Sequence, residues 1–93
     1  MATHYSAFTS GSVTVNPDSI ANAVRGSIAV TITGIAAGDL LVLEPPDDLE
    51  VGLAYAGHRI TSTSTVTIYL ANVSAAPVNG AALSWRYTWW DRT

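Results

Sequence analysis

Histidines and clustered acids are the residues of this sequence whose types could support acid–base catalysis or metal binding. The two imidazoles, His4 and His58, lie far apart in the chain and share no metal-ligand spacing. Asp47, Asp48 and Glu50 lie close together, but they lack the regular spacing of a calcium loop, so a solvated turn accounts for them. No serine lies in a nucleophile elbow, and the chain has no cysteine. The sequence therefore predicts no catalytic residue, no metal site, no cofactor and no enzymatic activity.

Aromatic side chains near the C-terminus are the better candidates for a binding function. Trp85, Tyr87, Trp89 and Trp90 follow one another closely in a segment with the alternation of a strand. Because neighbouring residues of a strand point to opposite faces, Trp89 and Trp90 cannot both lie in the core. The outward tryptophan then makes a protein contact, is covered by the N-terminal residues, or forms a stacking platform for a sugar. We favour the protein contact, because the segment shows few of the polar neighbours that sugar platforms have.

Charge is scarce in this chain of 93 residues and 9.7 kDa. Only 12% of the residues are charged, against about a quarter in typical soluble domains. The chain has four basic residues, all arginine, and seven acids, which give a net charge of −3. It therefore lacks the basic face that phosphate neutralisation requires, and nucleic acid is excluded as a partner. So little charge also indicates that much of the surface is covered, as in an obligate oligomer or a larger shell.

The elements that must position these residues read as short strands separated by turns. Residues 27–33 and 65–71 alternate as half-buried strands do, and turn residues recur about every 8–12 positions. Residues 39–43 are apolar on both faces, which predicts a central strand covered on both sides, with a hairpin partner over 51–60. Further strands are expected over 13–15 and 83–90, and a single helical turn over 18–24. We predict an all-β fold, a small antiparallel β-sandwich of the jelly-roll or Ig-like kind with six or seven strands; a small barrel is the alternative.

The N-terminal residues 1–12 are expected to form an extended arm ahead of a sandwich domain over residues 13–93. Fully extended, such an arm spans about 40 Å, which exceeds the roughly 30 Å diameter of the body. His4, Tyr5 and Phe8 give the arm side chains that it can bury against a neighbour. A frayed terminus without a role is the alternative interpretation.

Targeting and membrane signals are weak. The N-terminus lacks the basic and apolar regions of a secretion signal, so synthesis in the cytoplasm is expected. The long uncharged stretch over residues 60–85 is interrupted by polar residues, Pro77 and Gly80, and alternates like strands, so no membrane partner is expected. The glycosylation pattern that starts at Asn72 is interpreted as accidental.

Several motifs in the middle of the chain share an order and spacing. Gly38-Asp39 opens an apolar strand that ends in a Pro-Pro corner, and a Leu-Glu-x-Gly-Leu turn follows over residues 49–53. A Thr-Val-Thr strand then leads into Ala-Asn-Val over residues 65–73, and Trp85-Arg86-Tyr87 comes last. Over about 60 residues, this order resembles a group of small virion proteins of tailed bacteriophages.

The resemblance implies a β-sandwich structural protein of the phage particle, most like a head decoration or cement protein. Such proteins sit as homotrimers on the outer capsid surface and clamp neighbouring copies of the major capsid protein, often with an N-terminal arm. The acidic charge agrees with an outer location, since the inside of a head faces DNA. The interface residues expected for this virion protein, towards other copies or the capsid, are His4, Tyr5, Phe8, Trp89 and Trp90. The alternative is a tail or fibre module that binds a host surface glycan through an outward Trp89 or Trp90.

Overall fold

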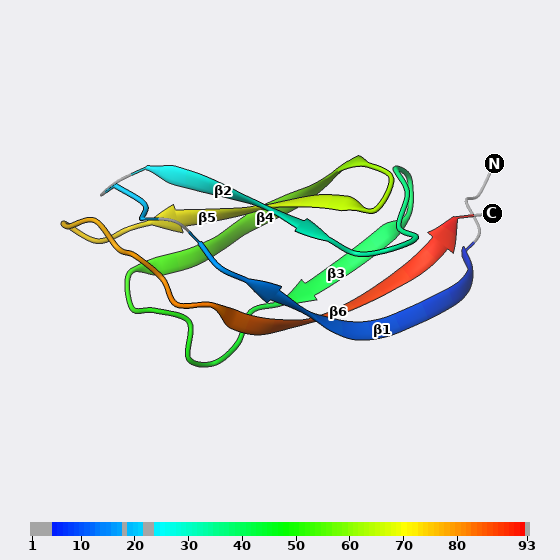
Figure 1. The fold of residues 1–93 in the computed structure, drawn as a ribbon, viewed down its shortest axis with the longest axis horizontal. Helices are drawn as coiled ribbons and strands as arrows, with labels where there is room; N and C mark the ends of the chain where they lie inside the picture. The colour runs from blue at the N-terminus through cyan, green and yellow to red at the C-terminus, as the bar shows by residue number, and fades with distance from the viewer. Residues whose placement is uncertain (1–4, 18, 22–23, 93) are drawn as a thin grey trace.

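Turn residues divide the chain into six antiparallel strands. The computed structural model describes residues 5–17, 19–21 and 24–92 (Figure 1). Within this part of the chain there is no helix, and so none long and apolar enough to span a membrane. The predicted helical turn over 18–24 includes residues outside those described. The strands are β1 (Tyr5–Val15), β2 (Arg25–Thr31), β3 (Leu40–Glu44), β4 (Leu53–Ser62), β5 (Thr65–Asn72) and β6 (Leu83–Arg92).

Two three-stranded sheets make up the fold, with the orders β1-β6-β3 and β2-β5-β4. Figure 1 shows β2, β5 and β4 as the upper layer and β3, β6 and β1 as the lower one. The predicted all-β class and antiparallel sandwich with six strands are therefore confirmed. The alternation that predicted the strands is also the burial pattern: along β5, half-buried and buried residues follow each other in strict turn.

The core fills the space between the sheets. Its fully buried members come from both layers, so neither sheet would be covered without the other. Trp85 of β6 is 1% exposed and meets Tyr55 of β4 edge to face, with ring centroids 5.6 Å apart. The remaining core residues are aliphatic apart from Trp89: Val15, Ile20, Val30, Ile32, Ile35, Leu41, Leu43, Leu53, Val66, Ile68 and Leu70.

The prediction for residues 39–43 was wrong in one respect. The segment is a strand, β3, but it lies at the edge of its sheet and only one of its faces is covered. Leu41 and Leu43 point into the core, whereas Leu40 and Val42 are 44% and 52% exposed. A strand that is apolar on both faces has the same sequence pattern whether its second face is buried in the chain or left for another surface.

The predicted hairpin between residues 39–43 and 51–60 is also not formed. β4 covers most of the predicted range, but it pairs with β5 in the opposite sheet. The Pro45-Pro46 corner ends β3, because proline cannot continue a ladder, and the following turns carry the chain across to the other layer. β4 and β5 instead form the hairpin, with Ser62 opposite Thr65.

The predicted boundary between an arm and a domain falls inside β1. This strand extends the expected strand over 13–15 back to Tyr5, and it pairs with β6 along its length. The backbone of residues 5–12 therefore belongs to the sheet of its own chain. Residues 1–4 lie outside the described part.

Asn72 connects the end of β5 to two loops. Its side chain is 1% exposed, and its Nδ2 donates to the backbone carbonyls of Ile20 and Ala76, at 2.8 and 2.9 Å. Its Oδ1 accepts hydrogen bonds from the backbone N–H and the hydroxyl of Ser74. All four hydrogen-bonding positions of the amide are therefore used. In the folded chain this amide is not presented to solvent, which agrees with the interpretation of the glycosylation pattern as accidental.

Replacing Asn72 with alanine should destabilise the fold by about 2–4 kcal/mol, because it removes the four hydrogen bonds of a buried side chain that join the end of β5 to two loops. Urea unfolding followed by tryptophan fluorescence measures the loss. Asn79→Ala is the matched control, since Asn79 is exposed, and it should change stability by less than about 0.5 kcal/mol. Equal effects of the two substitutions would contradict the role of the Asn72 network.

Candidate functional site

The outer face of the β1-β6-β3 sheet carries exposed apolar side chains. Leu40 and Val42 project from the edge strand β3, and Leu40 lies opposite Trp90 of β6 in the ladder. Trp90 is half-buried on this face, because its neighbour Trp89 points into the core. We call Leu40, Val42 and Trp90 the apolar patch. Exposed large side chains grouped on adjacent strands are typical of contact surfaces.

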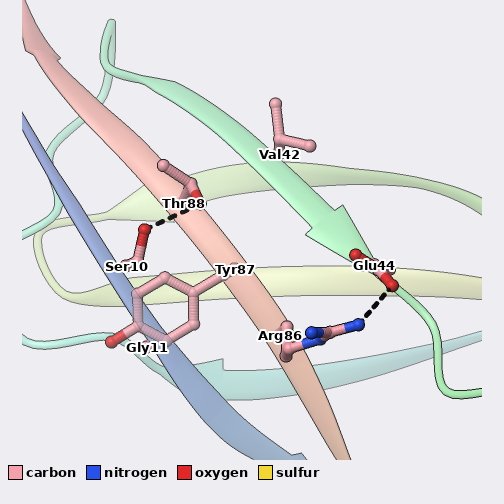
Figure 2. A pocket seen from close by; sticks show the side chains of 7 residues that line it. All are labelled: Ser10, Gly11, Val42, Glu44, Arg86, Tyr87 and Thr88. Carbon is pink, nitrogen blue, oxygen red and sulfur yellow. Dashed lines mark hydrogen bonds and ion pairs between the residues drawn. The ribbon is translucent and has the colours of Figure 1, made fainter.

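A shallow hollow of about 300 Å³ lies beside the apolar patch, across the three strands. Figure 2 shows Tyr87 lying over β1 at Gly11. A Cβ on Gly11 would come within 2.8 Å of the Tyr87 hydroxyl oxygen. Any larger residue at position 11 would therefore clash with the Tyr87 ring. The Tyr87 ring also stacks on Trp89, with centroids 6.0 Å apart. The hollow is lined by Ser10, Gly11, Val42, Glu44, Arg86, Tyr87 and Thr88.

Polar pairs cross the strands around this hollow. Arg86 donates from Nη2 to Glu44 Oε1 at 2.8 Å, and the Ser10 and Thr88 hydroxyls are 3.0 Å apart (Figure 2). The Arg86 and Glu44 side chains are 76% and 62% exposed, so the ion pair is screened by solvent and adds little stability. These groups are therefore available to a ligand or a partner surface at little cost.

The residues predicted for an interface do not lie on one surface. Trp90 lies on the outer face, whereas Trp89 is only 7% exposed and belongs to the core. The backbones of Tyr5 and Phe8 lie in β1, opposite Arg92 and Trp90 respectively. His4 lies outside the described residues.

Sequence reasoning missed Leu40 and Val42 as surface residues. The signal is the apolar character of both faces of residues 39–43, a pattern that fits a covered central strand and an exposed edge strand equally well. Only the sheet order, in which β3 has a neighbour on one side, distinguishes the two cases.

His58 contacts a tyrosine rather than catalytic partners. A β-bulge at Gly57, with a φ of 110°, shifts the register of β4 and brings His58 back to the inner side. The Tyr55 hydroxyl and His58 Nδ1 share a hydrogen bond of 2.5 Å. Burial lowers the pKa of His58 and raises the pKa of Tyr55 from their ordinary values. A hydrolytic site would instead need His58 beside a serine and a carboxylate.

Potential metal ligands are dispersed in the described part of the chain. There, no group of three or more histidines and acids comes together in a way that could hold a metal ion. Asp39 uses its Oδ2 to accept a hydrogen bond from the Ala36 backbone N–H, and Glu50 uses Oε1 to accept one from the Ala81 N–H. Both carboxylates thus take part in the local structure of loops.

The lowered pKa of His58 predicts a loss of stability below neutral pH. Unfolding returns the pKa of His58 to about 6.5, so the unfolded chain binds the proton more readily and stability falls as the pH drops through this value. Urea midpoints measured between pH 7.5 and 5 should decline less steeply for His58→Gln than for the wild type. Asn79→Gln, at an exposed position without a titratable group, is the control and should keep the wild-type slope. Equal slopes for His58→Gln and wild type would contradict the assignment.

The motifs that carry the phage resemblance mark strand ends in the structure. Gly38, with a φ of 96°, lies just before β3, and Pro45-Pro46 lies directly after this strand. The Leu-Glu-x-Gly-Leu turn leads into β4, with Gly52 at a φ of 98°. The resemblance itself stays a prediction: no protein-family model, no curated protein and no solved structure matches the chain.

Proposed function

We propose that this chain is a structural virion protein, a decoration or cement protein that binds the outer surface of a phage head and stabilises contacts between major capsid subunits. The observation that carries the proposal is the exposure of Leu40 and Val42 beside Trp90 on one sheet face. A surface of this kind, in a chain with so little charge, is suited to permanent contact with another protein. The proposal includes self-association as a homotrimer, which the family resemblance implies.

The energetics of such binding rest on apolar burial. Covering apolar surface contributes about 25 cal/mol per Å² before the costs of association, so each half-exposed side chain of the patch adds about 1 kcal/mol. A single copy therefore binds weakly. Many copies on one shell, each contacting more than one subunit, reinforce one another through multivalency.

The charge distribution supports an outer location on the head. The net charge of −3 gives the protein the same sign as packaged DNA. On the proposed docking face the described charges of Arg86 and Glu44 pair with each other. Such a face meets an apolar capsid surface without leaving an unpaired charge buried.

Leu40→Ser combined with Val42→Ser should lower the affinity for phage heads assembled without this chain at least about tenfold, which corresponds to 1.4 kcal/mol. Both side chains are about half exposed, so the variant should fold with near wild-type stability. Co-pelleting with such heads and heat resistance of the decorated particle are the measurements.

Val73→Ser is the matched control, because Val73 is 73% exposed outside the apolar patch. It should co-pellet as the wild type does. Undiminished co-pelleting of the double variant would contradict the docking role of the patch. Failure of the wild type to bind heads would contradict the proposed function itself.

A tail or fibre module that binds a host glycan is the second candidate, favoured by the polar groups around the hollow. Ser10, Thr88, Arg86 and Glu44 offer several donors and acceptors close together on one face, an arrangement suited to sugar hydroxyls. This candidate predicts that Arg86→Ala reduces binding to host cells or a glycan panel, while Leu40→Ser, at a patch residue that does not line the hollow, binds as before. Head binding without any glycan binding would exclude it.

A further inference from the structure

Two of the four arginines lie on the outer face of the β2-β5-β4 sheet. Arg25 of β2 and Arg59 of β4 are both exposed, and none of the three strands contains an aspartate or glutamate. This sheet face is therefore positive, in contrast to the net charge of the whole chain. We call it the arginine face and define it by Arg25, Arg59, Tyr69, Thr67, Ala29 and Ala71, which occupy outward positions in register across the sheet.

The arginines are spaced apart on an even surface. Arg25 pairs with Ala71 and Arg59 with Thr67, so two strand spacings and four residues separate them, about 16 Å along the diagonal. The Arg25 guanidinium lies 4.3 Å above the Tyr69 ring, which fixes its position through a cation–π contact. Tyr69 of the central strand lies between the two arginines, and the flanking outward positions Ala29 and Ala71 carry small side chains. This spacing fits a protein segment better than a small anion.

Acids gather in the loop between β3 and β4. Glu44 is paired with Arg86, and the Glu50 carboxylate accepts the Ala81 N–H. Asp47 and Asp48 are exposed and have no ionic or hydrogen-bond partner within the described residues. We call residues 45–52 the acidic loop. Figure 1 shows this loop at the lower edge of the molecule, whereas the β2-β5-β4 sheet forms the upper layer.

We propose that the acidic loop of one copy of this chain docks on the arginine face of the next copy. The two surfaces have opposite charges, and complementary charges orient partners and suppress wrong pairings. Burial of the Tyr69 edge and the alanines supplies the apolar part of the contact. Because loop and face lie on different sides of one molecule, the contact is head to tail; it closes into a ring or continues as a filament, depending on the rotation between copies.

This inference deepens the self-association that is part of the proposed function, and it can be tested without phage heads. Light scattering on the purified protein at about 0.15 M salt should give a mass above the 9.7 kDa of one copy, falling towards it in 1 M salt, where charges are screened within about 3 Å. Arg25→Glu with Arg59→Glu, and separately Asp47→Arg with Asp48→Arg, should each weaken association at least about tenfold.

The combined variant with all four reversals keeps the net charge of −3 and should recover the wild-type mass. Ser12→Glu with Thr14→Glu, at exposed positions of β1 on the other sheet, makes the chain more negative by two charges and should leave the mass unchanged. Circular dichroism verifies the fold of every variant. Because the chain has no cysteine, Asp48→Cys with Arg59→Cys should also give disulfide-linked copies on oxidation. A wild type that stays monomeric, or reversals that neither weaken nor restore association, would overturn the inference whether or not the protein binds heads.

Discussion

The alternation of side chains along β6 is the constraint on which the rest of the structure depends. β6 is the central strand of its sheet, and its inner positions carry Trp85 and Trp89, the two largest side chains of the core. The adjacent Trp90 must then face outward, where it meets Leu40 across the ladder. One strand thus determines both the centre of the core and the position of the apolar patch. A shift of register by one residue would exchange the two, so the core packing also holds the surface in place.

A small sandwich leaves apolar surface that its own chain cannot cover. With three strands in each sheet, two strands of each are edges, and residues that are apolar on both faces of an edge strand cannot all be buried. β3 is such a strand. It is also short and ends at two prolines, which limits uncontrolled pairing through its backbone edge. The outer side chains of β3, rather than its edge, are therefore the feature that a partner would recognise.

The sequence predicted the strands well, because their alternation is local. The sequence predicted burial and strand pairing less well where these depend on residues far away in the chain. For residues 39–43 the sequence predicts a central strand, since nothing within the segment distinguishes a covered second face from an exposed one. The pairing of β4 with β5 instead of β3 depends on where the chain goes after Pro46. The choice between Trp89 and Trp90 as the outward residue was left open, because either would satisfy alternation.

The arginine face is a second feature that depends on strand pairing and is not visible in the local sequence. Arg25 and Arg59 are isolated charges in the sequence, and only the register of β2 and β4 on β5 brings them to one surface without an acid. The apolar patch and the arginine face then lie on opposite sheets of the sandwich, so neither contact obstructs the other. A molecule with one face for a shell and another for its own neighbours can form both contacts at once. If the two proposed contacts form together, a copy held by its neighbours would lose less freedom on binding a shell, which is the physical basis on which weak copies would act together.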